Sequence, residues 1–147
     1  MKKNKATLVT LLFLSIMVLS SCEKEPTDER DKFVGTWKGT ENLTIPSLSL
    51  SLSDQVTYII LKSDSDTKQI IFLDEGAASD MTANVNGNAY TYDEYTETGT
   101  YEGETVSLKL NGGGSINGNV ITELGTLIFY ILGEEYPGTW SSTLNKQ

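Results

Sequence analysis

Short stretches in which apolar and polar residues alternate dominate this chain from Phe33 onward. Gly, Asn, Asp and Ser separate these stretches at intervals of about 8–12 residues, which is typical of the strands of a sandwich or barrel. In the clearest example, Leu48, Leu50 and Leu52 alternate with serines, so that one face of the strand is apolar. The pattern predicts an all-β domain of about eight to ten antiparallel strands.

Turn signals divide this region into strands. Asn86-Gly87 and Asn117-Gly118 are strong hairpin signals, and the polar loop at residues 63–67 predicts another hairpin. Asn111-Gly112-Gly113-Gly114 should break the strand before it. Besides the strand at 48–52, we expect strands at residues 34–43, 56–62, 68–74, 81–85, 89–96, 100–110, 119–123, 127–132 and 138–144.

The first 22 residues follow a different pattern. Lysines near Met1 precede an apolar run of twelve residues, 8–19, and small residues follow it directly before Cys22. This order is typical of a bacterial secretory signal. A transmembrane helix would need roughly 20 apolar residues, so this run is too short to cross a membrane.

Leu19-Ser20-Ser21-Cys22 resembles the lipobox of bacterial lipoproteins. The resemblance implies that residues 1–21 are a signal peptide and that Cys22 is acylated, with palmitate as a typical chain. Residues 22–32 would then be the lipidated cysteine and an acidic tether. The acidic stretch also resembles a signal for export to the outer membrane surface, so we expect a lipid-anchored, surface-exposed protein of the cell envelope. As the only cysteine, Cys22 could instead be a free thiol or an intermolecular disulfide partner.

Charge and composition limit the functions that the remaining chain can have. Without residues 1–21, which hold three lysines, eight basic residues face 20 acidic ones, a net charge of about −12. Such a surface repels nucleic acid, so no nucleic-acid partner is expected. The chain contains no His, which excludes Ser-His-Asp catalysis and His-ligated zinc. We expect no enzyme activity, no cofactor and no metal.

Phe33-Val34-Gly35-Thr36-Trp37 resembles the opening of lipocalin-like domains, in which a Gly-x-Trp packs its indole across one end of a barrel. The Gly-rich segment at residues 112–119 is similar to a late turn of short lipocalin-like lipoproteins. The resemblance implies a single antiparallel β-barrel over residues 33–147, with Trp37 at the closed end; a β-sandwich is the alternative. The predicted interior positions are Leu48, Leu50, Leu52, Ile60, Phe72, Val106, Leu108, Phe129 and Ile131.

Aromatic residues beside carboxylates are the candidate binding residues. Trp37, Tyr90, Tyr92 and Trp140 could stack on a ligand, because tyrosine and tryptophan bind sugars or cations through their ring faces. The alternative for each of them is packing in the core. The resemblance implies a small apolar or amphipathic ligand inside the barrel. The rival hypothesis is a filled core, with a protein or glycan partner bound at the surface.

Overall fold

The computed structural model describes residues 27–74, 79–101 and 104–147. Within these ranges the chain forms strands and one short 3-10 turn, and no described helix is long and apolar enough to cross a membrane. The elements are β1 (Gly35–Ile45), η1 (Pro46–Leu48), β2 (Leu50–Lys62), β3 (Gln69–Asp74), β4 (Met81–Asn86), β5 (Ala89–Tyr92), β6 (Tyr95–Tyr101), β7 (Glu104–Asn117), β8 (Val120–Ile131) and β9 (Glu134–Lys146).

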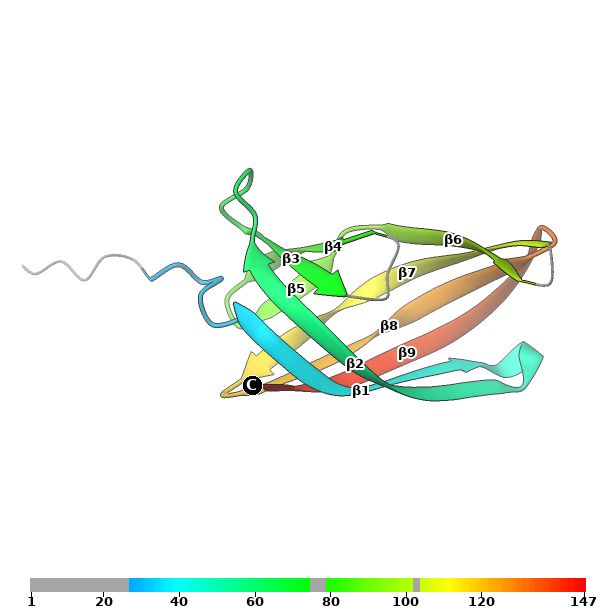
Figure 1. Cartoon of the computed structure of the whole chain (residues 1–147), viewed down its shortest axis with the longest axis horizontal. Coiled ribbons are helices and arrows are strands. Elements are labelled where there is room, and N and C mark those ends of the chain that lie inside the picture. Colours follow the sequence, from blue (N-terminus) through cyan, green and yellow to red (C-terminus); the bar gives the residue numbers. More distant parts are fainter. Residues whose placement is uncertain (1–26, 75–78, 102–103) are drawn as a thin grey trace, which may run out of the picture.

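The strands form one antiparallel sheet that closes on itself (Figure 1). The strand order is β5-β4-β3-β2-β1-β9-β8-β7, and pairing of β5 with β7 completes an eight-stranded barrel. The ninth strand, β6, pairs with the first half of β7, from Tyr95 opposite Leu110 to Tyr101 opposite Glu104. The prediction of a closed all-β barrel is confirmed, and the alternative sandwich is not what the chain forms.

The two ends of the barrel differ. The β2–β3, β4–β5 and β7–β8 turns lie at one end with the segment before β1, whereas the β1–β2 and β8–β9 hairpins extend from the other (Figure 1). We call these the closed end and the open end. A cluster of buried residues fills the closed end, including Trp37, Ile60, Phe72 and Leu144. A smaller cluster around Ile45, Leu127 and Trp140 lies toward the open end.

Two predicted interior positions are wrong. Leu48 lies in η1 and is 37% exposed, and Leu52 in β2 is 46% exposed. Pro46 begins the 3-10 turn, and Ser49 follows with a φ of +51°, so the alternation is interrupted before β2 begins. β3 pairs only with residues 58–62 of β2. In the described part of the chain, the segment of β2 near the β1–β2 turn therefore pairs with β1 on one side and with no strand on the other. Its apolar face is therefore left partly in solvent.

Other predicted interior positions are correct. Ile60 and Phe72 are fully buried, and Leu50, Leu108 and Phe129 pack against the open-end cluster. The interior of the barrel is thus lined along most of its length by the residues whose alternation indicated strands.

The predicted strand break in the Gly-rich run is also wrong. The strand β7 continues through Asn111 and the three glycines to Asn117, paired with β8 along that whole length. Glycine tolerates a strand interior where another group approaches the backbone closely. A Cβ on Gly112 would lie 2.6 Å from the Leu124 carbonyl oxygen, and one on Gly113 would lie 2.2 Å from the Tyr90 carbonyl oxygen. The glycines therefore permit close strand packing instead of ending the strand.

The segment before β1 plugs the closed end. Phe33 is fully buried, and its ring packs edge-on against Tyr90 with the ring centroids 5.4 Å apart. Trp37 is also fully buried and donates from Nε1 to the Phe33 carbonyl at 2.6 Å. The Lys146 ammonium lies 5.3 Å from the centroid of the Trp37 ring. Trp37 thus helps to fill the closed end of the barrel.

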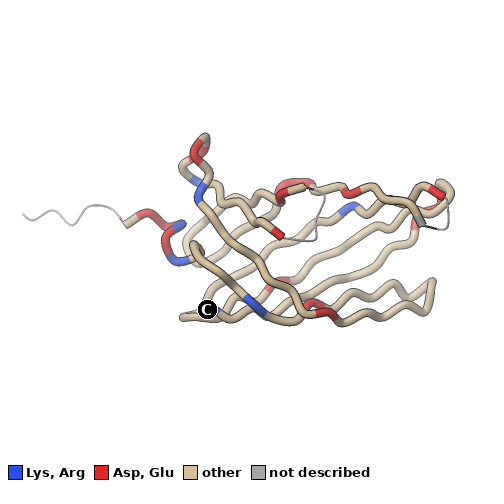
Figure 2. Tube along the Cα trace, in the orientation of Figure 1, with Lys and Arg blue, Asp and Glu red and all other residues tan. Residues whose placement is uncertain are grey.

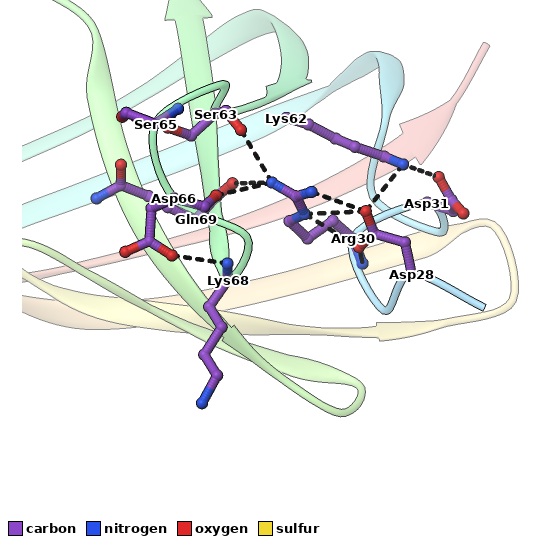
Figure 3. A network of polar contacts seen from close by, with 9 residues as sticks. All are labelled: Asp28, Arg30, Asp31, Lys62, Ser63, Ser65, Asp66, Lys68 and Gln69. Atoms are coloured by element: carbon purple, nitrogen blue, oxygen red, sulfur yellow. Dashed lines mark hydrogen bonds and ion pairs between the residues drawn. The ribbon is translucent and has the colours of Figure 1, made fainter. Parts of the chain in front are cut away.

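Arg30 fastens this segment to the β2–β3 turn (Figure 3). Its Nη1 donates to the carbonyl oxygens of Ser63 and Asp66 at 3.0 and 2.8 Å. Its Nη2 pairs with the Asp28 carboxylate at 2.8 Å, and the Lys62 ammonium pairs with the same carboxylate at 3.0 Å. The guanidinium thereby satisfies turn carbonyls that would otherwise need water.

This packing corrects one boundary of the predicted tether, which extended to residue 32. Residues 28–32 lie against the barrel, with Arg30 buried and Lys32 donating to the Gly87 carbonyl at 2.8 Å. Their charged composition suggested a solvated tether because it contains no apolar residue. The charges instead bond to each other and to backbone groups of the two turns. Cys22 and the rest of the predicted tether up to residue 26 lie outside the described residues.

Candidate functional site

Strand register brings a ring of interior positions together in the middle of the barrel. Glu41 on β1 lies opposite Ser142 on β9, and Ser142 lies opposite Glu123 on β8. Glu123 in turn lies opposite Gly114 on β7, which lies opposite Tyr90 on β5. Residues that share a row and face the interior can contact one another across the sheet. Polar side chains distant in sequence therefore meet inside the barrel.

Glu123 is the centre of this ring. It is 1% exposed, and its carboxylate accepts hydrogen bonds from the hydroxyls of Tyr90, Ser142 and, at 2.5 Å, Tyr92. Burial is the main cause that raises the pKa of both tyrosines, and the nearby Glu123 charge raises it further. Both phenols therefore stay protonated and remain donors. A buried carboxylate requires such bonds, since an unpaired buried charge is strongly unfavourable.

Gly114 makes room for this arrangement. A Cβ there would lie 2.5 Å from the Tyr90 hydroxyl oxygen and 2.9 Å from Cγ of Glu123. Any side chain at this position would therefore push the tyrosine away from the carboxylate. The glycine is what allows a tyrosine on β5 to reach across β7 to a carboxylate on β8.

A second carboxylate continues the ring on β1 and β2. Glu41 accepts a hydrogen bond from the Tyr58 hydroxyl at 3.1 Å. Burial raises the pKa of the Glu41 carboxyl, the Tyr58 hydrogen bond opposes this, and the charges of Glu123 and Asp74 raise it further. We call Glu41, Tyr58, Tyr90, Tyr92, Glu123 and Ser142 the polar belt.

The next row toward the open end is apolar. Leu43 lies opposite Trp140, which lies opposite Gly125, which lies opposite Gly112. A Cβ on Gly125 would lie 2.5 Å from the Trp140 Nε1, and one on Gly112 would lie 2.9 Å from the indole Cζ2. The indole therefore lies directly over two glycines on neighbouring strands, and its Nε1 donates to the Asn111 carbonyl at 3.2 Å.

A cavity of about 120 Å³ lies on the open-end side of the polar belt. Pockets for drug-sized ligands measure about 300–1,000 Å³, so this space suits only a small molecule or one end of a longer one. Its apolar wall consists of Leu43, Met81, Leu108, Leu110 and Trp140.

The rest of the lining is aromatic and acidic. Three tyrosines and three carboxylates complete it: Tyr58, Tyr92, Tyr95, Glu41, Asp74 and Glu97. None of the described residues around this space is Lys or Arg. Figure 2 shows Lys and Arg positions gathered toward the closed end. The contacts of Arg30, Lys32, Lys62, Lys68 and Lys146 place these five basic residues there. Basic residues thus gather around the closed end, whereas carboxylates line the cavity.

The four predicted binding residues fall into different places. Trp140 and Tyr92 line the cavity, whereas Tyr90 is buried beneath it in the polar belt. Trp37 lies at the closed end, in contact with Phe33. The lining therefore brings together two of the four predicted residues.

Sequence reasoning missed the interior carboxylates. Glu41 and Glu123 were not singled out, Asp74 was taken as a carboxylate beside a turn, and Glu97 was noted only as a neighbour of the tyrosines. Each of the four occupies an inward-facing position of its strand. A signal existed for Glu41, because it lies four residues after Trp37 and so shares its face of the strand. Within the described ranges, no group of three or more His, Cys, Asp or Glu residues is arranged to hold a metal ion.

Comparisons with known proteins leave the function open. No family model matches the chain, and no curated protein matches it. Among solved structures, it is similar to a protein with unknown function from the DUF3598 family of Nostoc punctiforme PCC 73102, with a TM-score of 0.49 and 11% identity. The match covers 80% of this chain and 48% of that one, so the chain spans about half the length of its neighbour.

Proposed function

We propose that this protein is a non-catalytic, lipid-anchored lipoprotein of the cell envelope whose lipocalin-like barrel binds a small amphipathic ligand. The observation that carries the ligand proposal is the cavity of about 120 Å³, which combines an apolar wall with tyrosines and carboxylates. Binding sites for small molecules usually have this composition, with apolar walls and a few polar groups that orient the ligand.

The packing of residues 28–33 supports a defined orientation for an anchored barrel. An acyl chain on Cys22 would attach only a few residues upstream of the plug formed by Arg30 and Phe33. The closed end would then face the membrane, and the cavity would lie on the far side of the polar belt. A ligand could reach it from the medium.

The two tryptophans provide a direct test of ligand binding. Trp37→Phe leaves Trp140, on the cavity wall, as the only indole, whereas Trp140→Phe leaves Trp37 at the closed end. Small amphipathic compounds should change the fluorescence of the first variant in a saturable manner and leave the second unchanged. Equal responses in both variants, or none in either, would contradict binding in the cavity.

The anchor has a separate test. Cys22→Ser should move the protein from the membrane fraction to the soluble fraction, because acyl chains contribute about 0.8 kcal/mol for each buried CH₂. Unchanged membrane association of this variant would refute the proposed anchor. Digestion of intact cells with a protease would report whether the barrel is on the outer surface of the outer membrane.

A second candidate function is binding of a protein or glycan partner at the surface. One observation favours it: Leu124 is 69% exposed beside a shallow groove over β7 and β8, floored by Gly113. Leu124→Glu should abolish partner binding in this case and leave ligand titration of the cavity unchanged. A variant that still captures its partner would exclude this face.

A further inference from the structure

We infer that the ligand of the cavity is a small organic cation, an alkylammonium ion whose charge faces the carboxylates and whose chain contacts the apolar wall. This inference rests on the proposed function and gives it a ligand class. The cavity has two chemically distinct sides, and one occupant must match both.

The acidic side of the cavity comes from three strands. Glu41 on β1, Asp74 on β3 and Glu97 on β6 line it, and the charge of Glu123 lies just beneath in the polar belt. Carboxylates that face one small space give it a negative electrostatic potential, which attracts a cation and repels an anion. An anionic or strongly electron-rich ligand is therefore disfavoured there.

Aromatic side chains extend the same preference. Tyr58, Tyr92, Tyr95 and Trp140 contribute to the lining. Ammonium groups are attracted to aromatic rings, and aromatic cages are a recurrent solution for binding them. Carboxylates together with several rings favour an organic ammonium over a fully hydrated inorganic ion.

The apolar wall and the volume limit the rest of the ligand. Leu43, Leu108 and Leu110 offer hydrocarbon contacts on the side of the cavity toward the open end. A space of about 120 Å³ holds an ammonium group with a short alkyl chain. A charged head with no hydrocarbon part would leave this wall uncovered.

Three probes with the same alkyl chain test the inference: n-butylammonium, n-butanol and n-butyrate. Each is titrated into full-length Trp37→Phe protein at constant ionic strength, with Trp140 fluorescence as the readout. We expect n-butylammonium to bind with an affinity roughly tenfold or more higher than that of n-butanol or n-butyrate. Equal or tighter binding of n-butanol or n-butyrate overturns the cation class and leaves the proposed binding function intact. No response to any of the three overturns both.

Matched variants assign the selectivity to the cavity. Glu41→Gln should weaken n-butylammonium binding roughly tenfold and leave n-butanol binding nearly unchanged. Asp64→Asn removes the same charge from the exposed β2–β3 loop and should change neither. If Glu41→Gln fails to fold by circular dichroism, Glu97→Gln takes its place. Unchanged n-butylammonium binding in the folded variant overturns the inference.

Discussion

The closed and open ends of this barrel use the same architecture for opposite purposes. At the closed end, Phe33 and Trp37 fill the interior, and Arg30 ties the incoming chain to a turn. Past the polar belt, the interior keeps a cavity and surrounds it with carboxylates such as Glu41. The packed interior stabilises the closed end, whereas the cavity on the open-end side lowers the stability that packing could provide there.

Under the proposed function, the closed end contributes stability and the cavity end contributes ligand binding. Buried carboxylates destabilise a fold unless they are well bonded, and a cavity loses the dispersion contacts of its lining. A barrel with no ligand could fill this space with one larger apolar side chain. The cavity beside Trp140, whose indole lies against two glycines, is consistent with the binding function proposed above.

The largest expected effect is at the closed end. Trp37→Ala should lower the free energy of unfolding by about 3–5 kcal/mol, the usual range for truncation of a fully buried Trp. Trp140→Ala should cost less, because Trp140 already borders a cavity. Urea unfolding followed by circular dichroism measures both. A loss below about 1 kcal/mol at Trp37 would contradict the plugged end.

The next effect tests the polar belt. Gly114→Ala places a methyl group 2.5 Å from the Tyr90 hydroxyl oxygen, so the Tyr90–Glu123 hydrogen bond must break or shift. We expect a loss of about 1–3 kcal/mol, as for other overpacked interiors. Gly99→Ala is the matched control, because nothing lies within 4 Å of its Cβ, and it should stay within about 0.5 kcal/mol of the parent. Equal stability of the two variants would show that the belt tolerates rearrangement.

The fold was predictable from the sequence to a large extent, because strand alternation and hairpin turns are local signals. The turns at Asn86-Gly87 and Asn117-Gly118 connect β4 to β5 and β7 to β8 as expected. Closure of the barrel by β5–β7 pairing is not encoded by a local signal. It depends on Gly113, because a side chain there would collide with the Tyr90 carbonyl oxygen on β5. Sequence reasoning took this glycine as a strand break, because nothing nearby in sequence reveals the neighbour that needs the space.

The candidate site was predictable only in part. Trp140 and Tyr92 were expected to contact a ligand, and both line the cavity. Glu41 and Glu123 were missed because an acidic residue in a strand is usually on the solvent face. Glu123 is buried because three hydroxyls on other strands reach it, and that register cannot be deduced from single strands.

A smaller expected effect is the pH dependence of the free energy of unfolding, which should differ between the two ends of the barrel. Glu41 has a raised pKa, mainly through burial, and Tyr58, Asp54, Asp74 and Glu123 surround its carboxyl. The folded state therefore holds this proton more tightly than the unfolded chain. The resulting stability is present below the ordinary value of 4.5 and is lost as the pH rises through the raised value. Urea unfolding from about pH 4 to about pH 8 should show a shallower decline for Glu41→Gln than for the parent. Parallel stability curves for the parent and Glu41→Gln would contradict the raised pKa of the Glu41 carboxyl.

The smallest effect has the opposite sign and belongs to the closed end. The pKa of the Asp28 carboxyl lies well below its ordinary 3.8, because the Arg30 side chain donates hydrogen bonds to it, with further bonds from the Arg30 backbone and Lys62. Its stabilisation is therefore present above pH 3.8 and is lost as the pH falls through the lowered value.

Asp28→Asn should flatten the loss of stability on the acid side and leave the slope above about pH 5 unchanged. Because these groups are near the surface, about 1 M salt should shrink the difference between parent and variant. The Glu41 effect, from within the barrel, should respond less to salt. If salt reduces the Glu41 and Asp28 effects on stability equally, Glu41 is as well solvated as Asp28. That result would contradict the placement of Glu41 in an enclosed acidic cavity.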